Sequence, residues 1–411
     1  MKRVFIFWFC AFVALCSSAQ KNNLDYFVTQ AVANSPLLKE YSNQIRSFAL
    51  DSGIIRATLR PQVNGISNNY VAPVFDGWGY DPAITNFRQV SGMIQVSKSF
   101  LSSKSIASQM TNLQLQSQAI SNNAKISEQD VIKAITDQYI VAFGEQLQLD
   151  FNYDVDTVLR QEDSLLKVLT RNNVFKQADY LAFAVTVQQQ ELITSQLEVQ
   201  YRYDYAALNY LAGIIDTTVD RLQDPQLTSK SFGDFTTSIF YRQFVLDSLK
   251  LANDRMLVQL NYRPKIGVFA DAGYNSSLIY KSYQNFGTSF GLTFSIPIYD
   301  GRQKKMQYAK IDLEEQTRSI KRDYFFQQRS QQILQFMQQL NATNHLIDQI
   351  NKQITYSQTL ITVNHELLAT GDIRLTDFIL SLNNYITARY LLTQNYINRL
   401  KIINQLNYWS R

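Results

Sequence analysis

The sequence predicts a mainly α-helical protein with β-strands, in which the order of a helix, a β-hairpin and a long helical hairpin occurs twice. Three observations support this fold class. Between residues 285 and 298, apolar and small polar side chains alternate with the period of a β-strand. From Arg302 to the last residue there is no proline and only one glycine, so a very long helical region follows the strand. The same succession of patterns occurs about 198 residues earlier in the chain.

The two copies match at several places along their length. The segment from Asn173 to Asp179 lies under the segment from Gly371 to Asp377 at the same offset. A tandem duplication explains this match, and it predicts four consecutive parts. These are a signal peptide (1–19), a first structural repeat (20–213), an inter-repeat equatorial linker (214–236) and a second structural repeat (237–411).

The N-terminus has the features of a secretory signal peptide. Lys2 and Arg3 precede an apolar segment that ends in small residues, which predicts cleavage between Ala19 and Gln20. A lipoprotein-like alternative would make Cys16 the first residue of the mature protein, although Leu15 stands where a small residue is expected. Both cysteines precede Ala19, so cleavage there predicts a mature protein without disulfides.

Charge and hydropathy narrow the class of protein. Removing Lys2 and Arg3 lowers the formal net charge from +5 to +3, a bias too small to indicate nucleic-acid binding. No window has the apolar length of a transmembrane helix. The sequence nevertheless holds 24 Tyr and 25 Phe, so any membrane role is expected to depend on β-strands.

The first repeat is expected to begin with one helix over 24–59 that contains Pro36 in an early turn. A β-hairpin spans 63–100, with strands over 63–71 and 89–100. A helical hairpin spans 101–211, and its two helices meet at Asn172 and Asn173, because asparagine tolerates the left-handed conformation of a tight turn. A coiled-coil register is predicted for the first of these helices from Ile106, Met110, Leu113, Ile120, Ala124 and Val131.

The second repeat follows the same order. A helix over 237–260 precedes a β-hairpin over 265–298, whose strands span 265–276 and 286–298. A helical hairpin over 302–406 then comprises helices at 302–369 and 376–406. Apolar residues occupy one face of each strand, and small or polar residues occupy the other. In the last strand the apolar face comprises Phe286, Phe290, Leu292, Phe294, Ile296 and Ile298.

Four strands cannot close a barrel, and lipid does not tolerate open strand edges. Strands from several copies of the chain are therefore expected to combine. Two copies would give eight strands, whose interior is filled by side chains, and three would give twelve, whose interior holds water. The small polar face favours a trimeric twelve-stranded barrel, with lipid outside and water inside.

No pattern of catalytic or metal-binding residues is present. His345 and His365 lie 20 residues apart without neighbouring carboxylates or cysteines at metal-ligand spacing, so both are expected to be solvated or packed. There is no glycine-rich phosphate loop. The sequence predicts no cofactor and no enzymatic activity.

Five segments occur in order along this duplicated chain: Ala33-Asn-Ser-Pro36, Leu59-Arg-Pro-Gln-Val63, Leu211-Ala-Gly213, Leu292-Thr-Phe-Ser-Ile-Pro-Ile-Tyr-Asp-Gly-Arg302 and Gly371-Asp-Ile-Arg-Leu-Thr-Asp377. With these segments and the duplicated order, the chain resembles the TolC-like outer membrane efflux protein family over nearly its whole mature length. The first copy has Asn173 where the family usually has glycine, and its SFLSSK segment (99–104) lacks the family's proline and Asp-Gly corner.

The resemblance implies a homotrimer whose twelve-stranded barrel spans the outer membrane and continues into a periplasmic α-helical barrel. It implies an exit duct for small molecules or ions, reached through a periplasmic adaptor from an inner-membrane transporter of the RND or ABC type. The helical tips implied to dock the adaptor contain Asn173, Val174, Lys176, Asp179, Gly371, Asp372, Ile373 and Arg374. For Lys176 and Arg374, the alternative is that they are exposed cations that only keep the tips soluble. Asp377 matches an acidic residue that constricts the periplasmic entrance, whereas Leu380 stands where a second is expected. A helix-capping role for Thr376 or Asp377 is the alternative.

A secreted or periplasmic structural coiled-coil protein without a conduit is the competing class, because the helices alone would allow it. The two amphipathic hairpins count against this class, since such a protein has no use for strands with one apolar face. Drug efflux, metal efflux and protein secretion all remain open as export functions.

Overall fold

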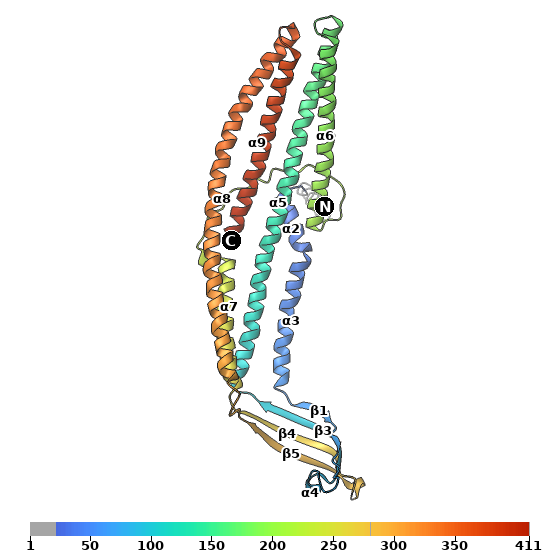
Figure 1. Cartoon of the computed structure of the whole chain (residues 1–411), viewed down its shortest axis with the longest axis vertical. Coiled ribbons are helices and arrows are strands. Elements are labelled where there is room, and N and C mark those ends of the chain that lie inside the picture. Colours follow the sequence, from blue (N-terminus) through green and yellow to red (C-terminus); the bar gives the residue numbers. More distant parts are fainter. Residues whose placement is uncertain (1–21, 280, 411) are drawn as a thin grey trace, which may run out of the picture. The chain divides into compact units, whose positions relative to one another are not determined.

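The computed structural model describes residues 22–279 and 281–410 of the chain. The predicted signal peptide, with its cleavage point between Ala19 and Gln20 and with Cys16, lies outside these residues. The chain forms two compact units, which are described separately (Figure 1). Of the described residues, those within Met1–Lys39, Ala124–Ile239 and Tyr324–Arg411 form the tip unit, and those within Glu40–Asn123 and Phe240–Asp323 form the strand unit.

The strand unit contains one antiparallel sheet with the order β1-β3-β4-β5, in which β2 also pairs with β3. Its strands are β1 (Gln62–Ile66), β2 (Asn69–Val71), β3 (Arg88–Phe100), β4 (Lys265–Ser276) and β5 (Phe286–Ser295). The long helices and this sheet confirm the predicted fold class. Each repeat supplies a hairpin, and β3 of the first repeat pairs with β4 of the second from Val90↔Ser276 to Phe100↔Ile266.

The expected strand over 63–71 is divided into β1 and β2, which is a departure from the prediction. The buried hydroxyl of Ser91 donates to the carbonyl of Asn68 at 2.8 Å, and it accepts from the Asn68 N–H at 3.0 Å. A side chain of β3 thus takes the place of ladder partners at this point, which interrupts the strand without changing its register with β3. A second departure is the short helix α4 (Pro82–Thr85) in the predicted loop.

Helices of the strand unit are α3 (Pro36–Thr58) from Glu40, α5 (Ser103–Arg171) as far as Asn123, α7 (Ile239–Asn261) from Phe240, and α8 (Gln303–Thr370) as far as Asp323. The predicted apolar register on α5 is only half-buried here, and the buried positions are Ser105, Ser108, Leu115 and Asn122. Ser108 donates to Asn253 of α7 at 2.9 Å, and Asn122 donates to Gln243 at 3.1 Å. The seam between these two helices is therefore partly polar.

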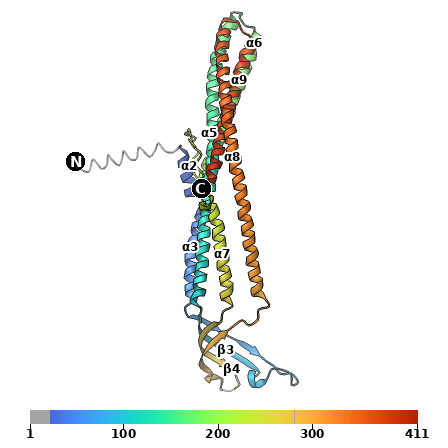
Figure 2. The same cartoon turned by 90° about the vertical axis from the view of Figure 1, so that its left-hand side faces the viewer.

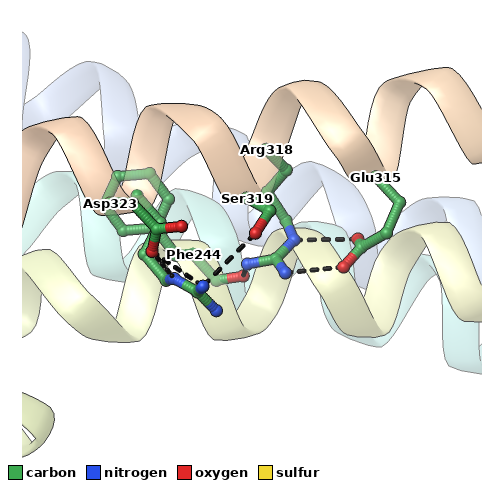
Figure 3. Close-up of polar contacts among 6 residues, drawn as sticks. Phe244, Glu315, Arg318, Ser319 and Asp323 are labelled. Carbon is green, nitrogen blue, oxygen red and sulfur yellow. Dashed lines mark hydrogen bonds and ion pairs between the residues drawn. The ribbon is translucent and has the colours of Figure 1, made fainter.

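Arg318 attaches α8 to α7 within the strand unit (Figure 3). Its guanidinium donates to both oxygens of Glu315, at 2.8 and 2.6 Å, and to the carbonyl of Phe244 on α7 at 3.3 Å. The hydrogen bonds from Arg318 lower the pKa of Glu315, so the pair stays ionised. Arg322 and Asp323 form a second ion pair beside it.

The tip unit contains two helical hairpins, in which α6 (Gln177–Ala212) returns along α5 and α9 (Leu375–Trp409) returns along α8 (Figures 1 and 2). It also contains α2 (Leu24–Asn34), which ends at Ser35. The expected single helix over 24–59 is therefore wrong, because the residue before a proline is disfavoured in helical conformation and Pro36 begins a new helix, α3. None of the helices in the described residues is both long and apolar enough to cross a membrane.

The segment between the repeats is attached to the hairpins by buried tyrosines. Tyr139 donates to the carbonyl of Gln223 at 2.6 Å, and Tyr201 donates to the carbonyl of Asp220 at 2.6 Å. Burial raises the pKa of both phenols, so both keep the proton that they donate. Beside them, Phe27, Tyr205 and Leu208 belong to the same apolar core.

Candidate functional site

One face of the sheet is apolar across all its strands, as the register shows. The row Val63, Val96, Ala270 and Phe290 crosses four strands, and the rows on either side continue the face through Ile94, Ala272 and Thr288, and through Val268 and Leu292. All of these side chains except the half-buried Val268 are exposed in the single chain, and Phe290 is 91% exposed. Such a face requires an apolar environment that one chain does not provide.

Within the described strands, the charged side chains on this apolar face lie at or near strand ends. Arg88 begins β3 and donates from Nε to the Ser277 carbonyl at 3.0 Å. Lys98 lies two residues from the end of β3, with its ammonium 5.5 Å from the centre of the Phe100 ring. Basic side chains at the ends of an apolar band can place their charge at the membrane surface. The face between them is free of charge along β3.

The opposite face is polar and lightly covered by side chains. Its central row comprises Asn64, Gln95, Asp271 and Ser289, and the Ser289 hydroxyl donates to the Asp271 carboxylate at 2.7 Å. Glycines at 273, 287 and 291 lie on the same face. Phe269 packs against Gly291, where an added Cβ would come within 2.7 Å of the ring. This face suits a water-filled interior.

The sheet ends at β1 and β5 in the described part of the chain, so each has one edge without a strand partner. Strand β5 contains 10 residues and β4 contains 12, which is enough to cross a bilayer at a tilt. A strand edge without a pairing partner cannot remain open in lipid. The sheet is therefore incomplete in a single copy of the chain.

The two helical turns at the tips have matching geometry. Asn173 and Gly371 both adopt positive φ, at 62° and 78°. The N–H of Val174 donates to Leu169 at 2.9 Å, and the N–H of Asp372 donates to Leu367 at 2.9 Å. Each turn therefore closes its helix in the same way, and the expected tolerance of asparagine for this conformation accounts for Asn173.

The two tips touch each other inside the tip unit. The Val174 side chain lies so near Gly371 that an added Cβ would come within 2.8 Å of it. Behind the turns, Leu166, Phe183, Leu368 and Phe378 are fully buried in one cluster, and Ile373 packs against it. Lys176 and Arg374 are exposed N-cap residues of α6 and α9, and neither helix has a side-chain cap.

Asp179 and Asp377 occupy matching places in the first turns of α6 and α9. Asp377 is exposed, and its N–H donates to the carbonyl of Arg374 at 3.0 Å. The expected alternative, in which the Thr376 or Asp377 side chain caps α9, does not match this geometry, because Arg374 is the N-cap and no side chain bonds there. A carboxylate in the first turn still interacts favourably with the helix dipole.

A buried carboxylate joins the two helical hairpins, which sequence reasoning missed. Glu162 continues the buried 3–4 spacing of Asn152, Val155 and Leu159 on α5 and is only 4% exposed. One of its oxygens lies 2.6 Å from Nδ1 of the half-exposed His365 on α8, and the other oxygen is buried without a hydrogen-bond partner. Burial raises the pKa of Glu162, and His365 opposes that rise. The sequence feature that could have identified this buried carboxylate is a polar residue, Glu162, at a core position of the heptad.

We predict that the melting temperature of Glu162→Gln rises relative to wild type as the pH increases from the ordinary carboxyl pKa through the raised pKa of Glu162, and that the difference then levels off. The raised pKa of Glu162 means that ionisation disfavours the folded state, so stability is lost as pH rises above the ordinary carboxyl pKa. Each unit of the pKa shift corresponds to about 1.4 kcal/mol. Thermal unfolding across this pH range measures the difference. The exposed Glu366 serves as the control through Glu366→Gln, and a pH-independent difference for Glu162→Gln would contradict the assignment.

Among the described residues, no group of three or more histidine, cysteine, aspartate or glutamate side chains could hold a metal ion. His365 contacts the Glu162 carboxylate, a partner that the expectation of a solvated or packed histidine did not include. His345 is exposed on α8.

Comparisons with known proteins agree on the fold. The channel protein CusC, studied for folding and transmembrane channel formation, matches with a TM-score of 0.75 and 11% identity over 94% of this chain and 92% of its own. The outer membrane protein VceC of Vibrio cholerae matches at 0.73 and 11% identity over 93% and 96%. The open MtrE outer membrane channel of Neisseria gonorrhoeae matches at 0.71 and 12% identity over 94% and 88%.

No family model and no curated protein matches the chain by sequence. The structural matches show that this chain has the fold of TolC-like outer-membrane channels, as the resemblance predicted. These structural matches include both the sheet and the helical hairpins of this chain.

Proposed function

We propose that three copies of this chain form a channel through the outer membrane, which serves as the exit duct of an export system. The sheet carries this proposal, because its apolar and polar faces run in register across four strands and stop at two open edges. Three such sheets supply twelve strands, and closure satisfies every edge. The likeness to outer-membrane channels supports the same arrangement. The structural coiled-coil alternative leaves the exposed apolar face without a purpose.

Conductance in a planar lipid bilayer tests the conduit. The purified protein is expected to insert and produce discrete ohmic current steps, because the polar face would line a water-filled lumen. Protein that inserts as a folded oligomer without conducting would overturn the proposal.

The proposed partners are a periplasmic adaptor and an inner-membrane pump of the RND or ABC type, with the adaptor docked at the tips. Support comes from the turns, where Asn173, Val174, Gly371 and Asp372 are exposed and Val174 lies beside Gly371, with Ile373 half-buried behind them. The cargo class is left open between drugs, metal ions and proteins. A wide aqueous duct need not bind its cargo.

We predict that Lys176→Glu combined with Arg374→Glu reduces adaptor capture at least tenfold. Both side chains are exposed cations at matching N-caps, so reversal puts repulsion where complementary charge favours docking. The measurement is pull-down of each periplasmic adaptor of the source organism by the intact channel. The control is Arg202→Glu, on an exposed face of α6 well away from the turn. Unchanged capture by the doubly reversed trimer would remove the docking role.

We predict that Asp377→Asn lowers cation selectivity of the channel, because threefold symmetry brings three carboxylates to the periplasmic end. At an assumed spacing of about 8 Å and an effective dielectric near 20, each pair repels by roughly 2 kcal/mol, so the ring attracts cations. Reversal potentials under a salt gradient measure the effect. Unchanged selectivity in Asp377→Asn, together with only a lower melting temperature in Asp377→Ala, would reduce Asp377 to a helix-stabilising residue.

A further inference from the structure

The polar face of the sheet contains one acidic group. Asp271 is the only carboxylate among the described strand residues, and it stands near the middle of β4. Within the described strands, the one cationic side chain on the same face is Lys265, at the beginning of β4. Six residues of extended chain separate them by roughly 20 Å. At that distance the ammonium does not neutralise the carboxylate in salt solution.

The surroundings hold the half-buried Asp271 in place and leave part of it exposed. Ser289 donates to one of its oxygens at 2.7 Å across the β4–β5 ladder. Gln95 is its neighbour in the same row on β3. The next residues on this face, Gly273 and Gly287, have no side chains. Met93 of β3 adds a side chain to this neighbouring row, and Asp271 remains partly exposed on this face.

A cavity of about 420 Å³ opens beside Asp271 on this face. The lining residues with polar side chains are Asp271, Asn275, Asn285, Thr288 and Ser289. Amide and carboxylate oxygens interact favourably with cations, and no lysine or arginine lines this cavity. The local chemistry is therefore suited to positive charge.

We propose that Asp271 makes the barrel lumen selective for cations, so that cationic solutes pass it more readily than anions of the same size. This inference rests on the proposed trimeric channel. Threefold symmetry puts three of these carboxylates on one level of the lumen, where low-dielectric walls concentrate their field. Asp271 thus determines the charge selectivity of the barrel lumen, independently of the helical tips.

The test compares reversal potentials of wild type and Asp271→Asn in bilayers under a potassium chloride gradient near 0.1 M. Asparagine keeps an acceptor for Ser289 and removes the charge. The cation-to-anion permeability ratio is expected to fall roughly twofold or more, with a smaller change at 1 M salt because the field is screened. Asp271→Lys is expected to make the lumen prefer anions.

The matched control is Asp76→Asn, which removes a carboxylate in the exposed turn between Phe75 and Trp78. Its permeability ratio is expected to equal that of wild type. If Asp271→Asn conducts with the wild-type ratio, the selectivity role is refuted while the channel stands. If wild type itself inserts and passes no current, the channel proposal fails first, and the role of Asp271 fails with it.

Discussion

Phe290→Arg is expected to prevent assembly of the protein in the outer membrane. Phe290 is 91% exposed on the apolar face, in the row with Val96 and Ala270. An arginine on the lipid face costs about 2–4 kcal/mol near the bilayer midplane, and a trimer would bear this cost three times. Comparing the folded oligomer in outer-membrane extracts of variant and wild type measures the effect.

Ser289→Arg is the matched control, one residue earlier on β5 and on the opposite face. Its guanidinium would lie beside Asp271, in water, and it could pair with that carboxylate. Assembly is therefore expected to continue. Equal assembly of the two variants would show that the faces of β5 are assigned wrongly.

The second large effect is expected at the tips, where Phe378→Ala should release the turns from their core. Phe378 is fully buried in one cluster with Leu166, Phe183 and Leu368. Truncating a buried phenylalanine costs about 3–5 kcal/mol. Hydrogen exchange is expected to accelerate in the helical ends around residues 166–183 and 368–378, while the sheet keeps its protection.

Leu380→Ala provides the control for this experiment. Leu380 lies two residues further along α9 and is 60% exposed, so little packing is lost when it is shortened. In the Leu380→Ala variant, hydrogen exchange at the tips is expected to proceed at nearly the wild-type rate. If Phe378→Ala leaves tip exchange unchanged, the cluster does not hold the tips together.

Local patterns in the sequence were sufficient to predict the order of elements. Period-two alternation predicted β5, although the strand ends at Ser295 and not at the expected residue 298, because Pro297 cannot donate a ladder hydrogen bond. The absence of proline predicted α8 and α9. The turn at Asn173 was predictable because a left-handed residue between two helical patterns leaves few alternatives. The duplication supported each assignment a second time.

Features that depend on distant partners could not be predicted in this way. The break at Ser67 and Asn68 depends on the buried hydroxyl of Ser91, a residue about 23 positions away. The buried seam of α5 follows Ser108 and Asn122, because α7 offers amide partners there. Apolar periodicity in a sequence does not indicate polar side chains that are buried between two helices.

The candidate site was predictable only in part for the same reason. The strand faces follow from alternation, whereas the place of Asp271 in a row with Gln95 and Ser289 requires the register between strands. The pairing of Glu162 with His365 joins helices of different repeats. Nothing in either local segment indicates which residue of the other repeat it meets.

The mass of the intact assembly, extracted from the outer membrane in mild detergent and measured by native mass spectrometry, tests the trimeric channel most directly. Three copies of the mature chain are expected, because three sheets complete twelve strands and remove every open edge. A monomer or dimer, or a protein recovered only from the soluble periplasmic fraction, would contradict it.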